Sequence, residues 1–315
     1  MSWNSGANEN LVQTRLDSYV KEEFDRRSPD EVMVDDALFF NQQNFDKGVY
    51  VHEELEGVGP FYDTAEEQIV NETSPRSDNL VSTRIRKYAL DLPIPDEAFK
   101  DAQLGSIQRV IADLSRQQRV SRDSYGYQRT YGDAFSGVTT PDGAAACSNS
   151  HTSLSGDTVD NLETGSLTAT NLEVVVRSLR RQRAQSGQLG GHVVAGLLVA
   201  LSLHEDAFEI TKSELAPYTG DNQVNYWSKV YPGMRVGTSA FLHTDYNGGL
   251  NSNVNTSYFV VSKNHHVTRL IREGYNSEIV EPKYDKKDRW YYKARFREVT
   301  LIESWGGLVG SSGTT

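Results

Sequence analysis

LGSIQRVIADLSRQQRVSRDSYGYQRTY, residues 104–131, carries the longest regular pattern in the chain. Its apolar residues recur at steps of three and four, which is the spacing of one face of an α-helix. No proline interrupts the pattern before Pro141, so a single helix over roughly 103–131 is expected. The residues with this spacing are Leu104, Ile107, Ile111 and Leu114.

Toward the C-terminus, the apolar run Val193 to Leu201 predicts a strand buried on both faces. Thr170 with Glu173 and Ser202 with Glu205 each have the spacing of a helix capping box. We therefore expect one helix ending before Gly187 and another running to Leu215. Two further segments predict strands, Tyr258 to Arg272 and the alternating run Trp290 to Arg297, which has one wet face.

Toward the N-terminus, Leu11 to Phe24 has helical spacing, and Ser28 with Glu31 predicts a second helix running to Phe40. Residues 41–92 hold few apolar side chains, several turn formers and two short extended runs, near Tyr50 and Ile85. A segment this polar cannot build its own core. It is interpreted as a protruding two-stranded loop.

The composition restricts the class of protein. The 315 residues are 37% hydrophobic, and no apolar run approaches the ~18 residues that a membrane span needs. The first ten residues have no secretory-signal pattern, and the single cysteine, Cys147, excludes an internal disulfide. A reducing cytoplasm is the expected environment. The net charge of −11 argues against a surface that clamps nucleic acid all over.

Catalytic and metal-binding signals are weak. No HExxH, GxSxG, Walker A or GxGxxG pattern occurs. Cys147 and His151 offer two of the four ligands of a structural zinc, and the Asn-rich loop 245–255 lacks the closing acidic residue of an EF-hand. We expect no catalytic residue, metal or cofactor. A hydrolase site could only lie near His151, Asp157 and Asp160.

Arginines gather on two of the predicted helices although the protein is acidic. They complement the helix dipole or solvate a surface face in one interpretation, and contact a polyanion in the other. Asp113 and Asp123 are the only acidic residues of 104–131. The candidate polyanion contacts are Arg109, Arg116, Arg119 and Arg122 on the long helix and Arg177, Arg180, Arg181 and Arg183 on the second.

Three segments, in this order, resemble phage major capsid proteins of the Hong Kong 97 type, especially Mu-like major head subunits. The first is KYALDLPIPDEAFKDA (87–102) with the long helix and YGDAFSG (131–137). The second runs from Pro141-Asp142-Gly143 to His151, with Ala-Ala-Cys-Ser where family members often have Leu-Phe-Ser. The third comprises GLLV (196–199), the helix from Glu205, the stretch 217–225 and ESWGG (303–307).

The resemblance implies an α+β fold of the Hong Kong 97 type and a shell subunit rather than an enzyme. The implied divisions are an N-terminal arm (1–45), an extended loop (46–92), a peripheral domain (93–188) with the spine helix 103–131, an axial domain (189–284), and a return strand with tail (285–315).

Partners and location follow from the same resemblance. The chain would form hexamers and pentamers in an icosahedral shell around double-stranded DNA, which the arginines above would contact weakly from the inner wall. A portal and a separate scaffolding protein are expected partners, decoration proteins stay open, and no membrane is involved. The virion capsid, assembled in the host bacterial cytoplasm, is the expected location.

Contacts between subunits would involve the extended loop. The candidates are Glu53, Glu54, Arg84, Arg86 and Lys87. Some relatives crosslink a loop lysine to an asparagine of a neighbour, but no catalytic carboxylate is evident beside Lys87, so no crosslink is expected. An encapsulin-like nanocompartment of the same fold is the nearest alternative, and a soluble hydrolase the more distant one.

Overall fold

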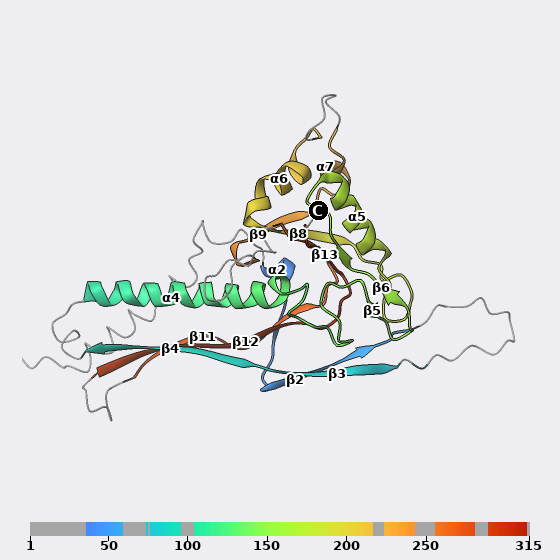
Figure 1. Ribbon diagram of the computed structural model, residues 1–315. Coiled ribbons are helices and arrows are strands. Elements are labelled where there is room, and N and C mark those ends of the chain that lie inside the picture. The colour runs from blue at the N-terminus through green and yellow to red at the C-terminus, as the bar shows by residue number, and fades with distance from the viewer. Residues whose placement is uncertain are drawn as a thin grey trace, which may run out of the picture.

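Figure 1 shows the computed structural model, an α+β subunit with two sheets, one long helix and a protruding hairpin. It describes residues 36–58, 74, 76–95, 104–216, 224–242, 256–280 and 289–313. The helix expected over Leu11 to Phe24, most of the helix expected from Ser28, and the loop 245–255 lie outside these residues.

The first sheet has four strands in the order β1-β11-β12-β4, and β1 is the only parallel neighbour in it. Helix α4 (Leu104–Tyr127) lies along this sheet and continues into a π-helical turn, Gln128–Gly132. The expected long helix is therefore confirmed. The strands are β1 (Asn41–Asn44), β4 (Arg86–Pro95), β11 (Val267–Val280) and β12 (Arg289–Ile302).

The alternation expected at Trp290 to Arg297 is also confirmed in β12. Tyr292, Ala294, Phe296 and Glu298 are buried, and the residues between them are half-exposed. Ile111 and Leu114 of α4 pack with Tyr292 and Ala294 in one apolar cluster. The helical spacing and the strand alternation thus describe the two sides of one interface.

The second sheet has five strands in the order β7-β13-β10-β8-β9. Its centre is β8 (Val194–Ala200), which is buried on both faces as its apolar run predicts. Its helices are α5 (Ala169–Arg181), α6 (His204–Lys212) and α7 (Tyr226–Val230). The other strands are β7 (Leu162–Glu163), β9 (Arg235–Ser239), β10 (Tyr258–Ser262) and β13 (Leu308–Ser311).

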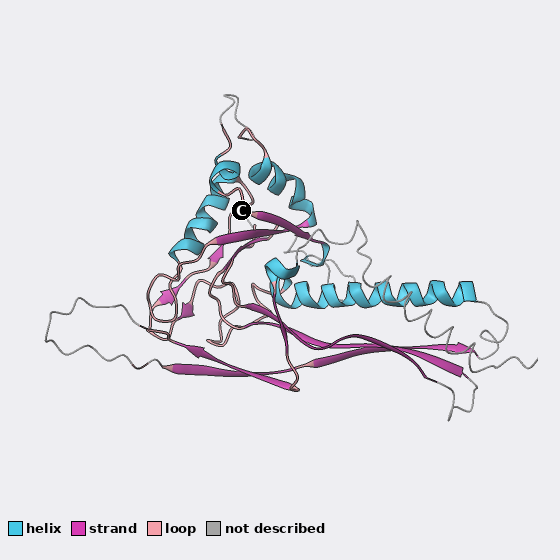
Figure 2. Cartoon of the chain, turned by 180° about the vertical axis from the view of Figure 1, so that it is seen from behind, coloured by secondary structure: helices cyan, strands magenta, loops and turns pink. Residues whose placement is uncertain are grey.

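The expected two-stranded loop is present as a hairpin of β2 (Val49–Leu55) and β3 (Ser77–Arg84). Figures 1 and 2 show that it extends to the side opposite α4, while the helices of the five-stranded sheet rise between the two. A smaller pair, β5 (His151–Thr152) and β6 (Thr158–Val159), lies beside α5.

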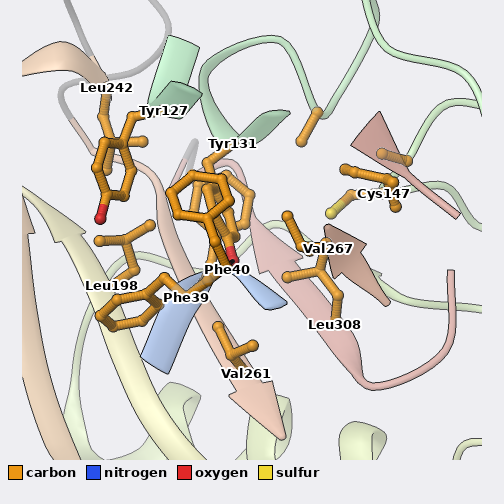
Figure 3. Packing of buried hydrophobic residues seen from close by; sticks show 14 residues of the cluster. Phe39, Phe40, Tyr127, Tyr131, Cys147, Leu198, Leu242, Val261, Val267 and Leu308 are labelled. Carbon is orange, nitrogen blue, oxygen red and sulfur yellow. Dashed lines mark hydrogen bonds between the residues drawn. The ribbon is translucent and has the colours of Figure 1, made fainter. Parts of the chain in front are cut away.

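The short helix α2 (Asp36–Phe39) corrects the expectation that all of 1–45 is an arm without a core. Phe39 and Phe40 are 0% and 1% exposed and pack with Tyr127 and Tyr131 in the central cluster (Figure 3). A Cβ built on Gly237 would lie 2.5 Å from the Phe39 ring, so this glycine makes room for it. The arm interpretation stays a prediction for residues before Asp36.

Two helix starts differ from the sequence expectation. Thr168, not Thr170, caps α5, because its side chain accepts a hydrogen bond from the Asn171 backbone N–H. Glu173 instead pairs with Arg177, one turn later. Ser202 lies in a 3-10 turn, Leu201–Leu203, and α6 starts after Leu203 with no side-chain cap and ends at Lys212.

The expected domain boundaries stay a prediction, but three elements pair across them. Helix α5, placed in the peripheral division, packs on the five-stranded sheet through Leu172 and Leu179. Strand β11, placed in the axial division, belongs to the four-stranded sheet, and β13, placed with the tail, pairs with β10. Sequence order could not show these pairings because each connects distant segments.

Candidate assembly and nucleic-acid surfaces

The root of the β2–β3 hairpin is fixed to the body of the subunit by side chains that point inward from β2. The Tyr50 hydroxyl donates to Glu303 Oε1 at 2.8 Å, and burial together with this contact raises the pKa of Tyr50 to about 12. Gln185 Nε2 donates to Glu54 Oε1 at 2.9 Å. Burial also raises the pKa of Glu54, although the hydrogen bond from Asn79 opposes this.

Glu54 is therefore part of the subunit's own structure. It is 3% exposed and bonded within its own chain, so it leaves the set of candidate inter-subunit contacts. The alternation that points Glu54 inward puts Glu53 on the exposed side of β2. Arg84, Arg86 and Lys87 are exposed as well, and all four keep their place as candidates.

A groove of about 960 Å³ separates the bend between β3 and β4 from the turn after α4. Arg84, Arg86 and Lys87 line one wall, and Arg129 and Asp133 line the other. Burial raises the pKa of Asp133, and the neighbouring Arg129 charge opposes this rise. The groove is a predominantly basic surface at the root of the hairpin.

The outward face of the hairpin is apolar and uncovered in the single chain. Val51 is 55% and Leu80 is 69% exposed, and strand alternation from the Val51–Ser82 pair places both on the same face. Val49 and Leu55 are 48% and 60% exposed. A lone two-stranded hairpin is marginal in water, so this one suits a neighbour that covers it.

A second set of exposed apolar side chains lies around α6 and α7. Phe208 of α6 is 56% exposed and Tyr226 of α7 is 52% exposed, and the two helices pack against each other. Such a group on one end of a subunit is typical of a protein contact. The further members are Leu201, Leu215, Val224 and Val230.

The structure distributes the arginines of α4 over different faces. Arg122 Nε donates to Glu298 Oε2 of β12 at 2.9 Å, so this side chain connects the helix to its own sheet. Arg119 is half-buried, whereas Arg109 and Arg116, seven residues apart, are exposed. Only those two of the four candidates present their charge outward along the helix.

The candidates on α5 are brought together more closely. Arg177 Nη2 contacts Glu173 at 2.8 Å, Arg180 donates to the Tyr231 hydroxyl at 3.3 Å, and Arg183 contacts Asp157 at 3.4 Å. All four arginines are exposed. Arg177, Arg181 and Arg183 line one hollow of about 370 Å³ between α5 and the β6–β7 segment.

His151 belongs to a buried structural network. Its Nδ1 lies 2.8 Å from Asp142 Oδ2, its Nε2 lies 3.1 Å from Asn161 Oδ1, and its ring stacks on Trp305. Asn161 Nδ2 donates to the backbone oxygens of Ala146 and Leu308, which connects the loop to β13. Burial would raise the pKa of Asp142, but the hydrogen bonds from His151 and Thr140 lower it overall.

This network bears on the hydrolase and zinc alternatives. His151 is 0% exposed, and its ring nitrogens contact Asp142 and Asn161 rather than Asp157 or Asp160. Cys147 is buried, and desolvation raises the pKa of its thiol to about 12. Across the part of the chain that the structure describes, no three His, Cys, Asp or Glu side chains group as metal ligands, and no helix is long and apolar enough to cross a membrane.

Sequence reasoning missed the buried ion pair that connects α2 to β11. Arg269 is 0% exposed, donates to Asp36 Oδ2 at 2.9 Å and stacks over Phe40. Burial, together with the nearby Asp36 charge, raises the pKa of Asp123 to about 6 despite the arginines around it. The one available signal was Gly126, where a Cβ would collide with the Arg269 guanidinium.

The sequence itself matches no protein-family model, and no curated protein matches it. Solved structures do match. The capsid of a native GTA particle has a TM-score of 0.54 at 9% identity, covering 92% of this chain and 95% of that one. A virus-like particle from Pyrococcus furiosus has a TM-score of 0.53 at 8% identity, covering 95% and 98%.

A third match is Gordonia phage Cozz, with a TM-score of 0.53 at 11% identity, covering 91% of this chain and 88% of that chain. The agreement extends over nearly the whole chain in each case, although very few residues are identical. The chain has the α+β Hong Kong 97-type fold of capsid and virus-like-particle subunits.

Proposed function

We propose that this chain is the major capsid protein of a tailed double-stranded DNA bacteriophage. It would assemble with itself, in hexamers and pentamers, into the icosahedral shell around the genome. The observation that carries the proposal is the hairpin, whose apolar face is exposed on a subunit that otherwise buries its strands. A second copy that covers this face stabilises it through the hydrophobic effect.

The fold supports the same proposal, because the chain covers most of three shell-forming proteins and is covered by them. A structural role also suits His151, the one polar cluster that could have suggested catalysis, because it is enclosed in the core. The location that follows is the virion capsid, with assembly in the host cytoplasm. A portal and a scaffolding protein would be further partners, and decoration proteins stay open.

A shell around the genome would give the arginines a partner. Contact with packaged DNA would be weak and independent of sequence, since it would depend on phosphate charge alone. Arg109 and Arg116 of α4 and the four arginines of α5 are exposed enough for this role. Arg122 is bonded to Glu298 and contributes less.

The second candidate is an encapsulin-like nanocompartment, because the virus-like particle from Pyrococcus furiosus is among the matching structures. Purification of the expressed protein followed by negative-stain microscopy tests both. Icosahedral particles of phage-head size, or native heads that contain DNA, would support the capsid proposal. Small uniform shells that enclose a protein would support the nanocompartment, and a monomer that never assembles would contradict both.

A further inference from the structure

The hollow between α5 and the β6–β7 segment combines donors that suit a phosphate group. Its volume is about 370 Å³, and Arg177, Arg181 and Arg183 line it together with the hydroxyl-bearing Thr158 and Ser178. Guanidinium groups bind phosphate oxygens in pairs, and hydroxyl groups add single hydrogen bonds. We infer that this hollow is a phosphodiester-binding site, through which the subunit contacts the DNA backbone.

The helix spacing supports a backbone contact in particular. Arg177 and Arg181 are four residues apart on α5, so their Cβ atoms lie about 5–6 Å from each other on one face. Phosphates of one DNA strand follow at about 3.4 Å along the helix axis, so the two guanidiniums can reach one phosphate or two neighbouring ones. Arg183 follows the end of α5 and extends the same wall.

Compensation of the helix dipole does not account for this set. A dipole argument concerns cations in the last turn, which are Arg180 and Arg181. Arg177 lies a turn earlier and Arg183 lies beyond the C-cap residue Gln182, yet both line the hollow. The lining is therefore better explained by a ligand than by the helix end.

Three carboxylates lie close enough to compete for these arginines. Glu173 pairs with Arg177 and Asp157 with Arg183, and both pairs are about half-exposed, where an ion pair is typically worth less than about 1 kcal/mol. Asp160 lines the hollow, but its Oδ1 accepts from the Leu162 N–H. A phosphate group can therefore displace the two exposed pairs.

The site rests on the proposed function only for its ligand being the packaged genome. The test uses purified subunits or capsomers of R177Q/R181Q, with R109Q/R116Q on α4 as the matched control. Binding of a short random-sequence DNA duplex is measured by fluorescence anisotropy over a range of salt concentrations. Negative-stain microscopy of the same preparations reports whether each variant still forms shells.

We expect R177Q/R181Q to weaken binding roughly tenfold and to reduce the salt slope by about 2, since each lost phosphate contact removes about one. E173Q should strengthen binding, because it frees Arg177. Unchanged affinity and slope in R177Q/R181Q, or an equal loss in the control, would overturn the site while shells still form. Tighter binding of polyglutamate than of DNA would also overturn it, in favour of an acidic protein partner.

Discussion

Strands β8 and β2 are both seven residues long, yet six residues of β8 are buried and only Glu54 of β2 is. Strand β8 lies in the middle of a sheet, with α2, α5 and α6 packed against it. Strand β2 has one partner strand, and its apolar side chains face away from the subunit. The difference separates the part of the chain that completes its own core from the part that needs another copy.

Phe39 tests the self-sufficient side with the largest expected effect. Its ring is fully buried, with an edge-to-face contact to Tyr131 at 6.4 Å, so Phe39→Ala should lower the free energy of unfolding by about 3–5 kcal/mol. Urea denaturation of dissociated subunits, followed by tryptophan fluorescence, measures this. Val49→Ala on the exposed hairpin is the control and should stay within about 0.5 kcal/mol. Equal losses in both would remove the distinction.

Asp142 tests the buried polar network and should give a smaller effect. Asp142→Asn removes a charged hydrogen-bond partner of His151, and we expect a loss of about 1.5–3 kcal/mol at neutral pH. The folded-state pKa of Asp142 is lowered, so its contribution is present above the unfolded pKa of about 3.9 and is lost as pH falls through the folded value.

The pH dependence separates this network from general destabilisation. Urea denaturation at neutral and strongly acid pH should show the difference between wild type and Asp142→Asn shrinking at acid pH. Asp157→Asn, whose carboxylate is 45% exposed, is the matched control and should change little at either pH. A difference that is the same at both pH values would show that the charge of Asp142 is not what stabilises the loop.

Tyr50 tests the connection between the two regions. Tyr50→Phe removes the hydrogen bond to Glu303 and should cost about 0.5–1.5 kcal/mol, confined to the hairpin. Hydrogen exchange should therefore become faster in β2 and β3 while β8 stays protected. Ser82→Ala, on the exposed side of β3, serves as the control. Unchanged exchange in the hairpin would mean that other contacts hold its root.

Much of the fold was predictable where one physical pattern dominates. The apolar run of β8, the helical spacing of α4 and the alternation of β12 each report burial directly, and each is confirmed. The polarity of the segment before Pro93 also predicted a hairpin without a core. These features are local, so a sequence read along the chain contains them.

The rest depends on contacts between distant segments. Phe39 enters the core because Gly196 and Gly237, far along the chain, leave space for its ring. Arg269 can be buried only because Asp36 lies beside it, and Glu54 changes from a candidate contact to an anchor because Gln185 reaches it. The Arg177, Arg181 and Arg183 hollow likewise needs the β6–β7 segment to close its other side.

The exposed apolar face of the hairpin carries the central claim, and V51T/L80T tests it most directly. Threonine keeps the β-branched shape that suits a strand, so the subunit's free energy of unfolding should change by no more than about 0.5 kcal/mol. We predict folded subunits with the wild-type urea midpoint that form no shells in negative-stain microscopy, whereas Val193→Thr, also an exposed valine, assembles normally. Normal shells from V51T/L80T would contradict the account.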